Sequence, residues 1–375
     1  MSKESTAFQE VVRFCLGSVG YRCERIGAFI GAVEALPTEP LTTLLGKAHL
    51  AGLFKSVVAR HELRTRRLQA AITRMVPVLR ARAIFNRNIH AELLNLGSKL
   101  AVADGRVRPV VLKGIACWDT YYDDPIARRV RDLDLLIESP DQADIICDVL
   151  EEEGYEALFF VDDKRTVREH FRSGESYSVP PLRIRRRADI EDDDEVGDFR
   201  ELEDVVRRHG GDTGLELVDD LGPILTVDVE LHRALFATTE GTFVGSEPSD
   251  YRLSATLPQF REMTTGAALA YTGVKLALDI LETLSCGENN VKCLKLAADF
   301  VRILEKSGQR DFEEAIVVAR RWNCLHHFAD TLQAVRVLTP EVALHGLPAP
   351  DGNDSLDLLL DVAADALEGT LPCSA

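Results

Sequence analysis

RVRDLDLLIES, residues 129–139, holds two aspartates, Asp132 and Asp134, that are separated by one leucine and followed by an apolar run. Residues i and i+2 of a β-strand face the same side, so both carboxylates would point one way while Leu133 and Leu135 point into the core. Two adjacent carboxylates on an apolar strand are unfavourable unless a cation lies between them. The stretch therefore predicts a buried strand carrying half of a metal site; the alternative is a solvated acidic pair.

The residues on either side of this stretch predict alternating strands and helices. RPVVLKG (108–114) is short, apolar and β-branched, which is typical of a buried strand. IACWDTYYDDP (115–125) predicts a helix that ends before its proline. After the central stretch, Ser139 and Gln142 form a capping box that begins a helix, and Gly154 ends it. This block predicts a strand–helix–strand–helix α/β unit.

A third strand is predicted in ILTVDVELHRAL (224–235), where apolar and acidic positions alternate. Asp228 and Glu230 would lie on one face of it. Three carboxylates from two neighbouring strands would make a two-metal site of the kind used for nucleotidyl transfer. Glu230 is the expected third carboxylate and Asp228 the alternative, whereas His232 is interpreted as a hydrogen-bonded structural histidine. Mg²⁺ suits one or two carboxylates together with substrate phosphates.

Gly114 and Lys113 are candidates for contact with a phosphate. Gly114 ends the 108–114 strand and opens the next helix, so the backbone could approach a phosphate closely there, and helix N-termini favour anions. Lys113 could supply a counter-charge. The alternatives are a simple strand-to-helix turn at Gly114 and a lysine that only balances nearby carboxylates.

Helical patterns occupy both ends of the chain. Ile89, Leu93, Leu96 and Leu100 recur at three- and four-residue steps and predict one apolar stripe. The expected parts are, in chain order, an N-terminal helical segment (1–104), an α/β core (105–250) with a charged insert (160–220), and a C-terminal helical domain (255–375), with a linker and a last amphipathic helix in the tail from 340.

Composition excludes several classes of protein. The chain of 375 residues is 46% hydrophobic and 28% charged, an ordinary composition for a soluble protein. No apolar run approaches the length of a membrane span, and the polar N-terminus lacks a signal-peptide core, so we expect a cytoplasmic protein without a membrane partner. None of the eight cysteines forms a CxxC pair, which argues against a zinc site. A net charge of −17 argues against a protein that coats nucleic acid.

Two short stretches are nevertheless basic. They are residues 60–82 and RIRRR (183–187), the second of which runs into the acidic 190–198. Such charge runs are usually a solvated helix face or a charged loop. The alternative is a local groove for a triphosphate or for a polyanionic acceptor.

The order of these motifs resembles the LKG-type uncharacterised nucleotidyltransferase family of the polymerase β-like nucleotidyltransferase superfamily, over about residues 85–335. Arg233 stands where many relatives have Trp, and the 160–220 insert is longer than usual, which affects acceptor specificity more than metal chemistry. The matching motifs are Leu112-Lys113-Gly114, Tyr122-Asp123-Asp124-Pro125 with Arg128, Asp132-Leu133-Asp134-Leu135-Leu136-Ile137, Gly154-Tyr155 and Glu230-Leu231-His232.

The resemblance implies an α+β fold, with a small mixed-sheet nucleotidyltransferase core between helical segments. It implies an enzyme that moves a nucleotidyl group from an NTP such as ATP to an acceptor hydroxyl and releases pyrophosphate, with two Mg²⁺ ions, or Mn²⁺, as cofactors. The catalytic metal ligands would be Asp132, Asp134 and Glu230, with Asp228 as the alternative, and the nucleotide-binding residues would be Lys113, Gly114 and Arg128. Arg128, like Lys113, could instead balance a local carboxylate.

Two questions stay open at this stage. The acceptor could be a small molecule, an RNA end or a protein side chain. The alternative function is a catalytically silent nucleotide- or partner-binding module of the same fold, for example a toxin–antitoxin or regulatory component. Acidic residues at all three strand positions favour the enzyme.

Overall fold

The structure, a computed structural model, forms two compact units. The first comprises residues 1–76, 121–128 and 268–375, and the second comprises residues 77–120 and 129–267. The boundary at residues 76 and 77 falls inside the long helix α5 (Arg66–Asp104), at Pro77. The residues that the structure describes are 3–124, 126–157, 166–174, 176, 178, 181–187, 203–207, 215–218, 222–237, 241–286 and 293–339.

The second unit is built on a mixed β-sheet. Its centre is β2 (Asp132–Leu136), which pairs in parallel with β6 (Gly222–His232) and antiparallel with β1 (Val110–Val111). The sheet runs in the order β3-β4-β6-β2-β1-β10-β9, β5 pairs with β6, and β7 and β8 form a separate ribbon. The remaining strands are β3 (Glu156–Ala157), β4 (Leu182–Arg187), β5 (Leu215–Val218), β7 (Phe236–Ala237), β8 (Phe243–Val244), β9 (Tyr251–Leu253) and β10 (Arg261–Met263).

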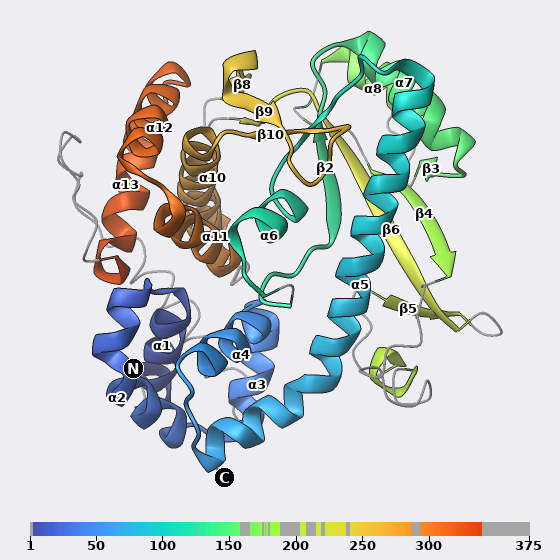
Figure 1. The fold of residues 1–375 in the computed structure, drawn as a ribbon. Helices are drawn as coiled ribbons and strands as arrows, with labels where there is room; N and C mark the ends of the chain where they lie inside the picture. The colour runs from blue at the N-terminus through green and yellow to red at the C-terminus, as the bar shows by residue number, and fades with distance from the viewer. Residues whose placement is uncertain are drawn as a thin grey trace. The chain divides into compact units, whose positions relative to one another are not determined.

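One face of this sheet packs against helices. Figure 1 shows α5 in front of β6, and the apolar stripe predicted on this helix is fully buried in the same core cluster as Leu133, Leu135 and Val229. The helix α7 (Pro140–Glu152) adds Ile146 and Leu150 to that cluster. Because the apolar residues of β2 and β6 face these helices, the alternate residues of both strands lie on the opposite face.

Local sequence signals placed α7 correctly. Ser139 caps α7 and accepts a hydrogen bond from the backbone N–H of Gln142, and Gly154 follows its end with φ of +86°. This unit also contains α6 (Ile115–Tyr121), whose last residue belongs to the first unit, α8 (Val167–Ser173) and the 3-10 helix η1 (Pro248–Asp250), and residues 203–207 are helical as well.

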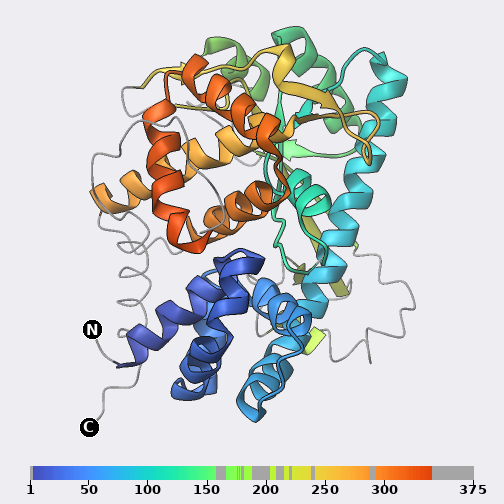
Figure 2. The ribbon, with the colours of Figure 1, turned by 60° about the vertical axis from the view of Figure 1, so that its left-hand side comes forward.

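The first unit is helical. Figure 2 shows its N-terminal helices in blue and its C-terminal helices in orange to red, and α1 packs against α2, α4 and α11. Phe14 of α1 stacks on Phe29 of α2, with ring centroids 4.0 Å apart. The helices are α1 (Lys3–Leu16), α2 (Val19–Ala35), α3 (Thr38–Lys47), α4 (Ala51–Arg60), α10 (Thr265–Cys286), which begins in the second unit, α11 (Cys293–Lys306), α12 (Gln309–Arg321), α13 (Leu325–Val335) and the 3-10 helix η2 (Arg336–Leu338).

The α+β class with a mixed sheet and helical flanks is therefore confirmed. None of the helices in the described part of the chain combines the length and the apolar character that a bilayer span needs. The division into three consecutive domains stays a prediction. Pro125, the acidic run 190–198 and the tail from 340 lie outside the described residues.

Candidate metal centre

The parallel pairing of β2 with β6 brings the predicted carboxylates together. Asp132 is the neighbour of Asp228 across the two strands, and Asp134 is the neighbour of Glu230. All four lie on the face opposite the helix-covered core, since Leu133 between the aspartates and Val229 between the acidic residues of β6 are both fully buried. His232 continues the same alternation on β6.

Asp134 is the centre of this group. It is 1% exposed, and its Oδ1 accepts a hydrogen bond from His232 Nε2 at 2.8 Å and pairs with Lys113 Nζ at 3.1 Å. Its Oδ2 is buried as well and has no hydrogen-bond partner in the structure. A buried carboxylate oxygen without a partner is costly, so it marks a place where a cation would be stabilising.

The same contacts keep Asp134 charged. Burial by itself would raise the pKa of this carboxyl, but the positive charge of Lys113 and the hydrogen bond from His232 hold the pKa well below its usual range. A deprotonated carboxylate is the form that binds a metal ion.

Glu230 completes the cluster on the neighbouring strand. Its side chain is partly buried, and its Oε2 lies 3.6 Å from His232 Nε2. Burial raises the pKa of Glu230, and the negative charges of Asp134 and Asp132 raise it further. A cation among these three carboxylates would remove that repulsion.

A divalent ion fits the donor set. One ligand atom each of Asp134, Glu230 and His232 lies within 4.8 Å of the other two. Carboxylate oxygens are the ligands that Mg²⁺ and Mn²⁺ prefer. The imidazole of His232 already binds Asp134, so it also has the position of a residue that orients a metal ligand.

Asp228, the alternative third carboxylate, has a different environment. Arg183 of β4 donates from Nε to Asp228 Oδ1 at 2.6 Å and from Nη2 to Oδ2 at 2.8 Å. This two-bond pair compensates the charge of Asp228 and uses both of its oxygens. Glu230 has no such arginine contact among the described interactions, which favours Glu230 as a ligand.

The predicted phosphate-contact residues lie beside the cluster. Gly114 has φ of +62°, a left-handed conformation that L side chains rarely adopt, and it directly precedes α6. Lys113 is held by Asp134, and its side chain is 28% exposed, so it can also face a ligand from solvent.

Arg128 belongs to the first unit, whereas Lys113 and Gly114 belong to the second. It is 2% exposed, and its Nε donates to Asp299 Oδ1 of α11 at 2.6 Å. Tyr122 donates to the same oxygen at 2.8 Å. These contacts favour the alternative in which Arg128 balances a local carboxylate.

Two participants were not assigned to the site from the sequence. His232 was interpreted as structural, but it contacts Asp134 directly. Its two-residue spacing from Glu230 on a strand was the signal that could have placed it on the face of the metal cluster. Arg183 was treated only as part of a basic run, and no local pattern shows that it faces Asp228.

The comparisons with known proteins agree with this geometry. A family model described as "Uncharacterised nucleotidyltransferase" matches residues 36–340, which is most of the chain. No curated protein and no solved structure matches this chain.

Proposed function

Since the chain belongs to the family of uncharacterised nucleotidyltransferases, we propose that it transfers a nucleotidyl group from an NTP to an acceptor hydroxyl and releases pyrophosphate. The observation that carries this proposal is Asp134. A buried, charged carboxylate with one oxygen unpartnered, next to a repelled glutamate, is a structure that a bound divalent cation completes.

Asp132, Asp134 and Glu230 would hold the metal, Mg²⁺ or Mn²⁺. Divalent ions bound there would neutralise the triphosphate and make the acceptor hydroxyl easier to deprotonate. His232 and Lys113 both contact Oδ1 of Asp134 and so hold this carboxylate in one orientation. Preorganised ligands reduce the rearrangement that the reaction would otherwise require.

The proposed reaction is an in-line displacement at the α-phosphorus. A bond forms between the acceptor oxygen and the α-phosphorus, the bond from that phosphorus to the bridging oxygen breaks, and pyrophosphate leaves. The acceptor proton passes to solvent or to a basic group. Lys113 and the backbone at Gly114 would bind phosphate oxygens; the ion pair of Lys113 with Asp134 and the left-handed conformation of Gly114 support this role.

The test uses the full chain and each of the four α-labelled NTPs, with Mg²⁺ or Mn²⁺, in the presence of cell extract. Label should appear on one class of acceptor, with release of pyrophosphate. Treatment of the product with nuclease or protease distinguishes an RNA end from a protein side chain and from a small molecule. If no label were transferred and no pyrophosphate released with any NTP or metal, the proposed enzymatic activity would be contradicted. The alternative, a catalytically silent binding module, would then be supported.

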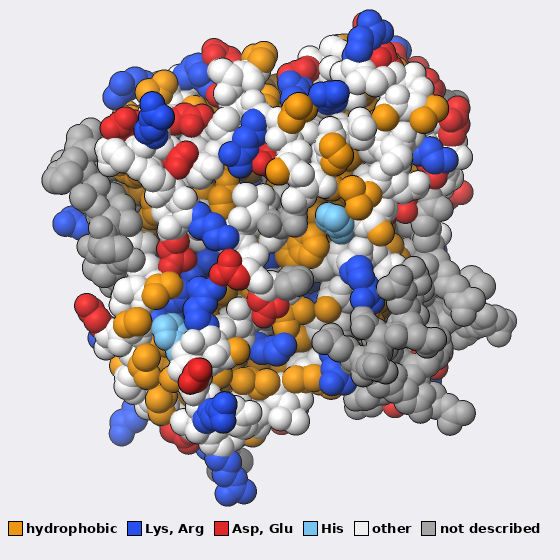
Figure 3. Space-filling model, viewed as in Figure 1, with side chains coloured by type: hydrophobic (Ala, Val, Ile, Leu, Met, Phe, Trp, Pro, Cys, Tyr) orange, Lys and Arg blue, Asp and Glu red, His pale blue; other side chains and the backbone are white. Residues whose placement is uncertain are grey.

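The face drawn in Figure 3 bears on the acceptor. Lys and Arg are mixed there with Asp and Glu among the coloured side chains. This agrees with the net charge of −17 and favours an acceptor bound locally over a long nucleic acid bound along the surface. The cytoplasmic location stays a prediction.

A further inference from the structure

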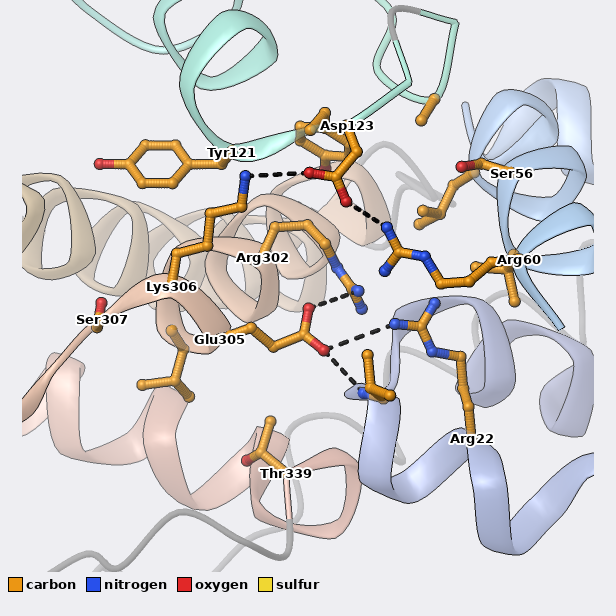
Figure 4. A pocket seen from close by; sticks show the side chains of 16 residues that line it. Arg22, Ser56, Arg60, Tyr121, Asp123, Arg302, Glu305, Lys306, Ser307 and Thr339 are labelled. Atoms are coloured by element: carbon orange, nitrogen blue, oxygen red, sulfur yellow. Dashed lines mark hydrogen bonds and ion pairs between the residues drawn. The ribbon is translucent and has the colours of Figure 1, made fainter.

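The first unit contains a cavity of about 460 Å³ that is rich in positive charge. Figure 4 shows three guanidinium groups directed toward one another around two carboxylates. The charged lining residues are Arg22 of α2, Arg60 of α4, Arg302, Glu305 and Lys306 of α11, and Asp123. Four cations against two carboxylates leave a net charge of about +2.

Arg22 is the least satisfied of these groups. It is 1% exposed, and its Nε donates to the carbonyl oxygen of Ser18 at 3.2 Å. Its Nη2 is buried without a hydrogen-bond partner, because the nearest carboxylate oxygen, Oε1 of Glu305, is 3.6 Å away. A buried guanidinium nitrogen in this state favours an anion within hydrogen-bond distance.

The two carboxylates of the cavity are already engaged. Glu305 accepts from the backbone N–H of Val19 at 2.8 Å and pairs with Arg302 Nη1 at 2.6 Å. Asp123 pairs with Arg60 and, at 3.3 Å, with Lys306 Nζ. Neither carboxylate therefore compensates Arg22 fully.

The electrostatic effect of this crowding is visible in Arg22 itself. Burial and the positive charge of Arg302 together lower the pKa of its guanidinium to about 10, against the opposing effect of Glu305. A bound anion would reverse these effects.

We propose that this cavity binds the phosphate group of a small phosphorylated molecule, with Arg22 and Arg60 as its principal donors. A phosphate monoester carries close to two negative charges at neutral pH, which matches the uncompensated charge. Guanidinium groups bind phosphate oxygens through paired hydrogen bonds. The cavity volume is within the range of small-molecule sites, and Leu53 and Val57 add an apolar wall for the organic part.

The cavity and the candidate metal centre share no residue, because all lining residues of the cavity belong to the first unit and all metal-cluster residues to the second. Binding of the phosphate therefore needs no divalent metal. The two proposals can fail independently.

The experiment is isothermal titration calorimetry of the full chain in EDTA, with inorganic phosphate, ribose 5-phosphate and AMP as probes and acetate as the carboxylate comparison. We expect saturable binding of at least one phosphate probe, tighter than any binding of acetate. Arg22→Met should weaken that binding at least tenfold. Arg25→Met is the matched control, since Arg25 lies on the same helix, is exposed and pairs with Glu10. The Arg25→Met variant should bind the phosphate probe with the affinity of the unaltered protein.

Two further variants keep the test decisive. Arg60→Gln changes a side chain that is 41% exposed, so it supplies a folded variant if Arg22→Met fails to fold, and it should also weaken binding. Asp134→Asn should leave phosphate binding unchanged. The proposal would be overturned if no phosphate probe bound saturably or if acetate bound equally well. It would also be overturned if the affinity stayed unchanged in both arginine variants, or if Asp134→Asn lost affinity.

Discussion

The candidate metal centre and the cavity of the first unit both carry an unbalanced local charge, which is negative in the first and positive in the second. Carboxylates outnumber the single Lys113 beside Asp134, whereas arginine and lysine outnumber the carboxylates around Arg22. Each region also buries charged groups with atoms that have no hydrogen-bond partner: Oδ2 of Asp134 in the first, and Nη2 of Arg22 and Nε of Arg302 in the second. A buried charge left unbalanced predicts the sign of the ligand: a cation in the first case and an anion in the second.

The largest expected effect concerns the anionic region. Asp134→Asn removes the central negative charge while it keeps the shape of the side chain, so nucleotidyl transfer should fall by about a thousandfold. Transfer of label from the preferred NTP measures this loss. Asp141→Asn, on the exposed first turn of α7, should keep full activity, and comparable activity of Asp134→Asn would remove this residue from the metal centre.

The buried ion pair of Arg128 with Asp299 balances its own charges, unlike the cavity, so its loss should lower the stability of the fold. Arg128→Met leaves the buried carboxylate of Asp299 without its guanidinium, so the free energy of unfolding should fall by about 3 kcal/mol. Denaturant unfolding measures it, with Arg106→Met as control, because the exposed pair of Arg106 with Asp104 contributes little. A raised KM for the NTP with unchanged stability would instead support Arg128 as a nucleotide-binding residue.

Within the anionic region, the two residues of β6 should differ. Glu230→Gln should lower transfer by about 10- to 100-fold, because Glu230 faces Asp134, whereas Asp228→Asn should lower it by less than about tenfold, because Asp228 is paired with Arg183. Titration of both variants with Mn²⁺, with nucleotidyl transfer as the readout, gives the apparent affinity for Mn²⁺. The reverse order of effects would make Asp228 the third carboxylate.

The smallest expected effect is a pH dependence in the first unit. Burial and the neighbouring His326 together lower the pKa of His327 to about 4, so the folded state keeps this histidine neutral. Between pH 6.5 and about 4 the unfolded chain binds the proton more readily, so stability should fall as the pH falls. His327→Gln should flatten the dependence of the melting temperature on pH in that window; an unchanged slope would contradict this assignment.

Features that depend on residues near in sequence were predictable. The stripe on α5 and the capping of α7 follow from three- and four-residue spacing, and both are confirmed. The shared face of Asp132 and Asp134 follows from the two-residue period of a strand, and the family resemblance led to the same strands. Alternation therefore located the anionic region without any knowledge of strand order.

Features that depend on distant residues were not predictable. Arg183 meets Asp228 only because β4 pairs with β6 in one register, and Arg128 meets Asp299 across 171 positions. The predicted strand 108–114 shrinks to Val110–Val111, because hydrogen bonding to β2 and β10, rather than apolar character, determines its length. The cavity around Arg22 likewise joins α2, α4 and α11, whose sequences show no common pattern.

The wide separation of the metal-centre residues along the chain has a consequence for folding. The hydrogen bond between Asp134 and His232 joins residues 98 positions apart, so the centre exists only after β2 and β6 have paired. Pairing of such distant segments is slow, although doubling the length of the intervening chain costs only about 0.6 kcal/mol. A divalent ion would therefore bind late and act chiefly by slowing unfolding.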